Sequence, residues 1–377
     1  MKIGIVVPYF TSYISGNEYG LAQSLSSFGH DVTIITSTAG APREKELNAN
    51  NKCSSSAHDF SITYLPTKLD VGDNPVVLNV EKHVKCYDVL MLQEDYPFLC
   101  HKSYSTAKKY DISTILSSER TYFPDNILKR SALRILDATV NKRLRDGVDI
   151  LTAHCTSAKE FMINELGVRR ETQVINVGVD AEMFKPFPCE NKYLHEGDFK
   201  ILTVARLHKY KGLKNLIEAM SIIVTEIPAA HLYILGKGPE KENLQVLVGK
   251  LQLNRSVTFI SQSFPNSEMP HLYSECDVYV QPSVVEPYGI AVLEALACGK
   301  PVVGSNIGGM IDTIVEGKSG FLVDPSNPAG LVEKLLMLSD QKLREKFGVF
   351  ARERVENEFS WDIIGYTYLK HIKKLQA

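Results

Sequence analysis

The sequence lacks the features that mark several large classes of protein. No stretch approaches the run of about 18 apolar residues that a membrane-spanning helix needs. The seven cysteines are scattered and form no C-x-x-C pair, which argues against a disulfide framework and indicates a reducing compartment. H-E-x-x-H and D-x-D motifs are also absent, so the sequence gives no support for a bound metal.

The sequence also lacks a large excess of positive or negative charge. The chain of 377 residues has 42 Lys and Arg against 44 Asp and Glu, a formal net charge of −2. Because nucleic-acid-binding domains are strongly basic, this balance predicts no nucleic-acid partner. The start, Met1–Pro8, is one lysine followed by a short apolar run, which is typical of a buried strand and too short for a signal peptide. We therefore expect a cytoplasmic protein.

What the sequence does contain is a regular alternation of short apolar runs and helical patterns. Such alternation predicts an α/β fold with parallel sheets. The polar, proline-bearing segment 186–198 interrupts it and is a candidate linker, after which a second series begins. We predict two doubly wound domains, with a site in the cleft between them. Expected strands are 2–7, 31–36, 61–65, 88–92, 112–116 and 149–153 in the first series, and 200–204, 232–235, 257–260, 277–281 and 301–303 in the second.

One candidate site lies where the strand 277–281 leads into a helix. The motif runs from Glu286 to Glu294, with a helix expected from residue 289. The backbone N–H groups of Tyr288, Gly289 and Ile290 would be free at the helix start, which suits a phosphate. Glu294, one turn later, could accept hydrogen bonds from ribose hydroxyls. The alternative is an ordinary acidic residue near a helix N-terminus.

A second candidate site follows the strand 200–204, at the edge where parallel sheets bind ligands. Arg206 and Lys211 lie in this loop, and Gly236 follows the next strand. A guanidinium and an ammonium group together suit a diphosphate. The alternative is that both are solvated surface charges. Phosphate-compatible loops after several strands of one domain favour the binding site.

Together these motifs resemble the retaining glycosyltransferases of family 4, which have the GT-B fold of two Rossmann-like domains. The resemblance is strong over 174–325, moderate over 1–36 and weak over 37–173. The matching pieces are Ser15–Glu18, Gly29–Val32, Val177–Asp180 with Phe184 and Pro186, Ala205–Leu207, Lys211-Gly212, Gly236–Pro239, Pro282-Ser283, Glu286–Glu294, Gly299–Val303, Gly308-Gly309, Gly320–Val323 and Phe359–Trp361.

The resemblance implies a domain organisation in which the last helix crosses back to the first domain. An N-terminal acceptor-side domain would then comprise 1–187 plus 359–377, and a C-terminal nucleotide-sugar domain 188–358. The reaction implied is transfer of a hexosyl group from a nucleotide diphosphate sugar, UDP- or GDP-linked, to a hydroxyl acceptor that is a glycan, a lipid-linked molecule or a small molecule. Neither a cofactor nor a metal is implied.

Residue roles follow from the same motif matches. Arg206 and Lys211 would stabilise the departing diphosphate, and Glu286 would support the donor sugar. Glu294 would hold the ribose, while Gly16 and Asn17 would approach the donor phosphate from the first domain. Gly236, Tyr288, Gly289 and Ile290 complete the implied donor site.

The sequence departs from the family pattern after the strand 112–116, where many members carry a histidine. Here the segment reads Ser117-Ser118-Glu119-Arg120, so either Ser118 or Glu119 occupies that place. Glu119 could be a catalytic base, or it could be a loop carboxylate paired with Arg120. Two alternative functions stay open: a nucleotide-sugar-binding subunit without acceptor chemistry, and a nucleotide-sugar epimerase.

The segment 125–146 is a basic, amphipathic helical pattern. Family members that use lipid-linked acceptors often bind anionic membranes through such a surface. Peripheral contact with the inner membrane face is therefore one interpretation, and a solvated helix is the other.

Overall fold

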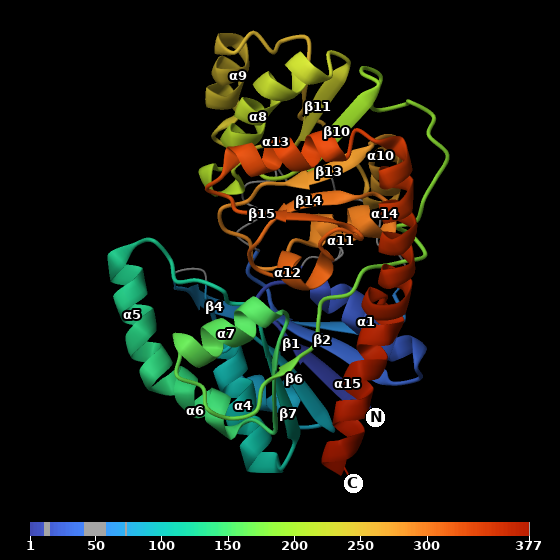
Figure 1. Cartoon of the computed structure of the whole chain (residues 1–377). Helices are drawn as coiled ribbons and strands as arrows, with labels where there is room; N and C mark the ends of the chain where they lie inside the picture. The colour runs from blue at the N-terminus through green and yellow to red at the C-terminus, as the bar shows by residue number, and fades with distance from the viewer. Residues whose placement is uncertain (11–15, 41–57, 72–73, 377) are drawn as a thin grey trace. The chain divides into compact units, whose positions relative to one another are not determined.

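The computed structural model describes residues 1–10, 16–40, 58–71 and 74–376 (Figure 1). Ser15 and Cys53 lie outside the described residues. The chain divides into two compact units: unit 1 comprises Met1–Gly178 and Trp361–Ala377, and unit 2 comprises Val179–Ser360. Within the described residues, no helix combines the length and apolar character needed to cross a membrane.

Unit 1 is built on a sheet that has seven parallel strands within the described residues. Its order, β3-β2-β1-β6-β7-β8-β9, reverses beside β1, so the carboxyl edge of the sheet is suited to ligands. Most of these strands are buried on both faces, which is why they read as continuous apolar runs. The strands are β1 (Lys2–Val6), β2 (Asp31–Ser37), β3 (Ser61–Leu65), β6 (Val89–Gln93), β7 (Ser113–Ser118), β8 (Ile150–Ala153) and β9 (Gln173–Val174), with β4 (Thr67–Asp70) and β5 (Pro75–Val77) forming a separate antiparallel pair.

One helix prediction in unit 1 is wrong. The segment 125–146 forms two helices, because the backbone of Thr139 leaves the helical region at φ −124° and ψ −91°. The break turns Asp137, Asn141 and Arg145 into the protein, where all three are buried. The helices of unit 1 are α1 (Asn17–Ser27), α3 (Val80–Val84), α4 (Phe98–Tyr110), α5 (Ile127–Ala138), α6 (Val140–Gly147), α7 (Thr156–Asn164) and α15 (Trp361–Gln376).

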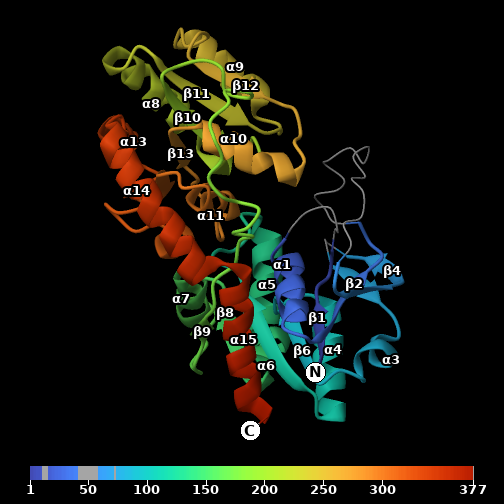
Figure 2. The same cartoon turned by 90° about the vertical axis from the view of Figure 1, so that its right-hand side faces the viewer.

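The return of the C-terminal helix to the first domain is confirmed. Helix α15 lies beside α1 (Figure 2), and its apolar side chains Ile364, Tyr368 and Ile372 are part of the core formed around β1. The indole ring of Trp361 occupies the space beside Gly20, where a Cβ atom would lie 2.0 Å from the ring. A side chain at that position is therefore excluded.

Unit 2 repeats the architecture with a parallel sheet in the order β12-β11-β10-β13-β14-β15. The predicted α/β class with two doubly wound domains is thus confirmed. The strands are β10 (Phe199–Val204), β11 (Ala230–Leu235), β12 (Val257–Ile260), β13 (Val278–Gln281), β14 (Val302–Ser305) and β15 (Gly320–Val323). The helices are α8 (Leu213–Glu226), α9 (Lys241–Lys250), α10 (Met269–Glu275), α11 (Ile290–Ala297), α12 (Met310–Thr313), α13 (Pro328–Met337) and α14 (Gln341–Arg354), with helical turns η1 (Lys209–Lys211), η2 (Asn266–Glu268) and η3 (Val355–Phe359).

The segment 186–198, predicted to be a linker, packs onto unit 2. The carboxylate of Glu275 accepts hydrogen bonds from the backbone N–H groups of Lys192, Tyr193 and Leu194. Leu194 is fully buried. The division between the units therefore comes earlier than residue 187, after Gly178.

Candidate functional site

The loop after β10 is held against the loop after β13 at the carboxyl edge of unit 2. Gly212 has φ +66°, and a Cβ atom there would lie 1.9 Å from the carbonyl oxygen of Pro282, so glycine allows this close approach. The N–H of Val284 donates to the carbonyl of Tyr210 at 2.7 Å. These contacts bring Lys211 toward Glu286 from a distant part of the sequence.

Lys211 and Glu286 form an ion pair, with Nζ 2.6 Å from Oε2. Their side chains are only 12% and 10% exposed. The same carboxylate oxygen accepts from Nε2 of Gln281 at 3.1 Å and from Oγ of Ser283 at 3.2 Å. The structure thus brings two of the predicted site residues together with Ser283, which belongs to a matched motif, and it adds Gln281, to which the sequence analysis gave no role in the site.

Arg206 lies in the same loop and is exposed. Its guanidinium stands 5.9 Å from the centre of the Tyr210 ring, and Nζ of Lys211 stands 5.6 Å from the same ring. Tyr210 therefore lies between the two cations, and both belong to one surface at the carboxyl edge. Sequence reasoning had no signal for Tyr210, because an aromatic residue in a loop has no periodicity to mark it.

Helix α11 begins directly after Gly289, which adopts φ +93°. An α-helix leaves its first N–H groups without intrahelical partners, so this end can bind an anion. Tyr288 is 3% exposed and therefore helps to anchor the turn, whereas Ile290 is 37% exposed. Gly309 donates its N–H to the carbonyl of Pro287 at 3.0 Å, which fixes the loop before the helix.

Glu294 lies inside α11 and accepts a hydrogen bond from the hydroxyl of Tyr273 at 2.7 Å. Burial raises the pKa of Glu294 to about 7. Burial, and to a smaller extent the charges of Glu294 and Glu286, also raises the pKa of Tyr279 well above its usual value. Both carboxylates of the motif thus act on the hydroxyl of one buried tyrosine of β13.

Gly236 ends β11 with φ +153°, and a Cβ atom there would lie 1.9 Å from the carbonyl oxygen of Ala205. The glycine therefore lets the loop after β11 lie against the loop that carries Arg206. Next to it, Nζ of Lys237 donates to Oγ of Ser263 at 3.1 Å. The loops after β10, β11 and β13 form one continuous polar edge of unit 2.

Gly16, Asn17 and Glu119 belong to unit 1. Gly16 precedes α1, and the amide of Asn17 donates to Nε2 of His154 at 3.0 Å. Glu119 is exposed, and its N–H donates to Oε1 of Glu94 at 2.5 Å. The alternative interpretation, in which Glu119 pairs with Arg120, does not describe the ion pairs of Arg120.

Arg120 instead forms ion pairs with Asp95 at 3.2 Å and with Asp137 at 2.9 Å. Asp95 and Asp137 also contact the buried guanidinium of Arg145. Sequence reasoning missed this cluster, because its members come from separate elements and the turn at Thr139 that directs Asp137 inward has no clear sequence signal.

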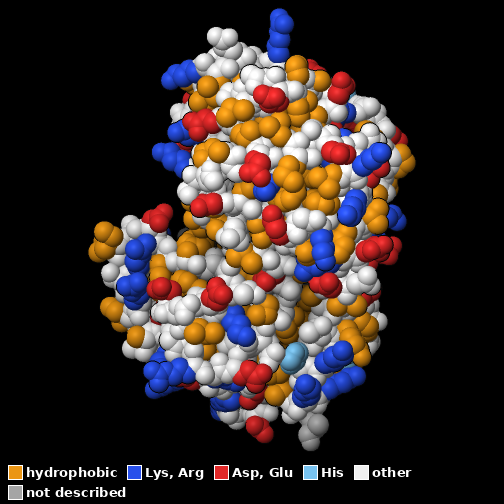
Figure 3. Space-filling view, viewed as in Figure 1, with side chains coloured by type: hydrophobic (Ala, Val, Ile, Leu, Met, Phe, Trp, Pro, Cys, Tyr) orange, Lys and Arg blue, Asp and Glu red, His pale blue; other side chains and the backbone are white. Residues whose placement is uncertain are grey.

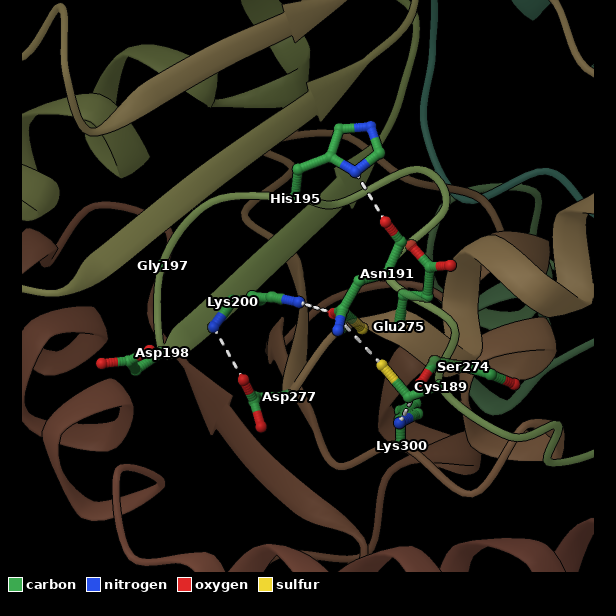
Figure 4. A pocket seen from close by; sticks show the side chains of 11 residues that line it. Cys189, Asn191, His195, Gly197, Asp198, Lys200, Ser274, Glu275, Asp277 and Lys300 are labelled. Atoms are coloured by element: carbon green, nitrogen blue, oxygen red, sulfur yellow. Dashed lines mark hydrogen bonds between the residues drawn. The ribbon is translucent and has the colours of Figure 1, made fainter.

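A pocket of about 540 Å³ lies at the other end of the unit 2 sheet, near the first residues of β10 and β13 (Figure 4). Its polar groups bind one another. Asp277 accepts from the backbone N–H of Lys200 at 2.8 Å, and Lys300 donates to the carbonyl of Ser274 at 2.7 Å. Glu275 holds the backbone of 192–194. We therefore place the candidate site at the carboxyl edge and interpret this pocket as structural.

Comparison with known proteins finds a family match in unit 2. Residues 190–354 match the family model described as "Glycosyl transferases group 1". We call this matched segment the group 1 domain. This domain lies within unit 2 and contains Arg206, Lys211 and Glu286.

Relatives and solved structures resemble more of the chain than this domain. An uncharacterized glycosyltransferase, MJ1607, of Methanocaldococcus jannaschii is 28% identical over 97% of this chain and 96% of its own length. A GDP-mannose-dependent phosphatidylinositol monomannoside mannosyltransferase of Mycolicibacterium smegmatis is 28% identical over 59% of this chain and 62% of its own. The structure of Anabaena HepE in complex with UDP has a TM-score of 0.80 at 18% identity and covers 99% of this chain and 100% of HepE. The GT-B fold, which the motif resemblance implied, is thereby confirmed.

Proposed function

We propose that the chain is a retaining, metal-independent glycosyltransferase that moves a hexosyl group from a nucleotide diphosphate sugar to a hydroxyl acceptor. The observation that carries the proposal is the Lys211–Glu286 pair at the carboxyl edge of the group 1 domain. It puts a cation for the diphosphate beside a carboxylate for the sugar, which are the two charges that the transfer needs.

The chemistry follows from charge development. As the bond between the anomeric carbon and the diphosphate oxygen breaks, the leaving group gains negative charge and the sugar gains positive charge. Lys211 and Arg206 would stabilise the first and Glu286 the second. The acceptor hydroxyl oxygen forms the new bond, and its proton passes to the departing phosphate. Gly289 and α11 would bind phosphate oxygens, and Glu294 the ribose.

A uridine or guanosine nucleotide is the proposed donor. The structure of HepE was solved with UDP, and the mycobacterial relative is named as GDP-mannose-dependent. We propose that the protein works in the cytoplasm. Fixed cations in the donor site support metal independence, and activity unchanged by EDTA would test it.

The main test is release of UDP or GDP from labelled UDP-glucose and GDP-mannose. Lys211→Ala and Glu286→Ala should abolish release, whereas Lys214→Ala should leave it unchanged. Lys214 is a suitable control because it is 70% exposed and forms only a surface pair with Glu218 at 3.6 Å. Retention is tested by the anomeric proton coupling of the first product. Tight donor binding without any turnover would instead support a nucleotide-sugar-binding subunit.

Helix α5 offers a surface for a lipid-linked acceptor. Leu128 is 81% exposed and Ile135 67%, and Lys129 and Arg134 of the same helix are also exposed. Figure 3 shows hydrophobic and basic side chains together over this part of unit 1. We propose peripheral contact with anionic membrane through this surface. Leu128→Ser should lower co-sedimentation with phosphatidylglycerol vesicles, while Val349→Ser, at a position 61% exposed in unit 2, should not. Equal binding of all three proteins would contradict the contact.

A further inference from the structure

The carboxyl edge of the unit 1 sheet gathers polar side chains that the donor chemistry does not use. Gln93 ends β6 and lies opposite Ser117 of β7, while Ser118 lies opposite Ala153 of β8. Glu94 and His154 follow these strands directly. Neighbouring parallel strands therefore deliver an amide, a carboxyl group, a hydroxyl group and an imidazole to one place, at the edge where doubly wound sheets bind ligands.

Glu94 is held there in an unusual way. Its backbone adopts φ +71°, a region that costs a non-glycine residue about 1–3 kcal/mol. The side chain is buried, and its carboxyl accepts from Oγ of Ser118 at 3.0 Å and from the N–H of Glu119 at 2.5 Å. Burial, followed by the charges of Asp95 and Glu119, raises the pKa of Glu94 to about 8. The group is thus mostly protonated at neutral pH and can donate as well as accept.

The side-chain amide of Gln93 is buried with one polar atom that forms no hydrogen bond within the described residues. The residue is 5% exposed, and its Nε2 has no partner within the part of the chain that the structure describes. Its Oε1 lies 3.4 Å from Nε2 of His154, so the amide belongs to this cluster. A buried polar group without a partner costs about 1–3 kcal/mol. An oxygen atom of a bound ligand would remove that cost.

His154 is neutral and fixed. Its Nδ1 donates to the carbonyl of Ile175 at 3.3 Å, and its Nε2 accepts from Nδ2 of Asn17 at 3.0 Å. Burial lowers the pKa of His154. It therefore brings no positive charge to the edge and orients the amide of Asn17.

The arginines of this region are already paired. Arg120 and Arg145 both form ion pairs with Asp95 and Asp137 beneath the edge. The carboxylate of Glu119 is exposed beside the cluster, and its charge acts on both Glu94 and His154. A phosphorylated ligand would meet this negative charge, whereas the hydroxyl groups of an uncharged ligand would meet good hydrogen-bond partners.

We propose that this edge binds an uncharged polyhydroxyl acceptor, that Glu94 binds one of its oxygen atoms, and that Glu119 sets the preference against phosphorylated acceptors. The acceptor edge consists of Asn17, Gln93, Glu94, Ser118, Glu119 and His154. The assignment rests on the proposed transferase function. Nε2 of Gln93 donates to one acceptor oxygen, the protonated carboxyl of Glu94 donates to another, and Glu119 repels phosphate.

The test compares paired acceptors with the full-length chain and labelled UDP-glucose or GDP-mannose. The pairs are glucose with glucose 6-phosphate, myo-inositol with inositol 3-phosphate, and glycerol with glycerol 3-phosphate. We expect kcat/KM at least tenfold higher for the uncharged member of a pair that is used. Glu94→Met should lower transfer to it about tenfold, because Met can neither donate nor accept, while UDP or GDP affinity and donor hydrolysis stay unchanged.

Two further variants complete the design. Glu119→Lys, at an exposed position, should shift the preference toward the phosphorylated member even if Glu94→Met folds poorly. Asp149→Asn is the matched control: this carboxylate accepts from Thr114 at the amino edge of the same sheet, and its loss should leave acceptor preference unchanged. Preference of the wild type for phosphorylated acceptors, or no transfer to any uncharged one, would overturn the proposal. Failure of the wild type to bind or hydrolyse any donor would instead contradict the proposed function.

Discussion

Under the proposed function, the Lys211–Glu286 pair links the stability of the group 1 domain to binding of the donor. Replacing Lys211 with Met removes the ammonium group and leaves the carboxylate of Glu286 buried with only Gln281 and Ser283 as partners. Replacing Glu286 with Gln leaves the ammonium group without its counter-ion. A diphosphate would compete with Glu286 for Lys211, so the pair must open in part when donor binds.

The magnitude can be estimated from the geometry. At 2.6 Å the Coulomb attraction is about 6 kcal/mol for an effective dielectric constant of about 20, before the cost of desolvation. Breaking a buried pair from one side costs about 3–5 kcal/mol, whereas removing both charges is much less costly. We therefore expect each of Lys211→Met and Glu286→Gln to destabilise by about 3 kcal/mol. The double variant should be more stable than the sum of both losses by about 2 kcal/mol.

The assay is a double-mutant cycle from urea unfolding at pH 7, repeated with UDP and with GDP. Wild-type protein should gain about 2.7 kcal/mol when the preferred nucleotide exceeds its Kd a hundredfold. Lys211→Met should lose this gain. Additive single losses would refute the energetic reasoning, and an unchanged gain from nucleotide in Lys211→Met would refute the assignment of Lys211 to the diphosphate.

Three other predictions follow from separate contacts. Gly212→Ala should cost about 3 kcal/mol more than Gly317→Ala in urea unfolding and should abolish nucleotide binding, because both glycines have positive φ but only Gly212 would also clash with Pro282; equal losses would contradict the clash. For Glu294, the folded pKa of about 7 lies above the ordinary 4.5, so its contribution to stability is present below pH 4.5 and is lost as pH rises through 7. Glu294→Gln should therefore gain about 3 kcal/mol relative to wild type between pH 4.5 and 8 in urea unfolding, and parallel stability curves would contradict the raised pKa. Trp361→Ala should cost about 3–5 kcal/mol and expose α15 to limited proteolysis, which peptide mapping would detect; unchanged cleavage would contradict its anchoring role.

The fold could be predicted from the sequence because parallel strands buried on both faces leave a direct pattern. Runs such as 3–7 and 232–235 are apolar without interruption, and the structure has the strands β1 and β11 there. The prediction that 186–198 is a linker was wrong, although the observation behind it was right. The segment is polar and irregular, but Glu275 satisfies its backbone N–H groups and anchors it to unit 2.

Some residues of the candidate site could be predicted from the sequence, and others could not. Arg206, Lys211 and Glu286 could be predicted, since each follows a strand whose end is visible in the sequence. Gln281 and Glu94 could not, because their roles depend on which strands become neighbours and on one left-handed backbone conformation. The residue types in β6 do not predict that Glu94 contacts Ser118 of β7, or that Gln93 contacts His154 after β8.

The point where the chain enters and leaves unit 2 has an architectural consequence. Val179 donates its N–H to the carbonyl of Phe359 at 2.8 Å, so the first and last residues of this unit are paired. In topological terms the group 1 domain is an insertion: a closed module that starts and finishes at one hinge of unit 1. Such a module can be exchanged between parent chains, or circularly permuted, without cutting a strand of either sheet. The proposed function assigns the donor to unit 2 and the acceptor to unit 1, and this arrangement would then allow recognition of the two substrates to diversify independently.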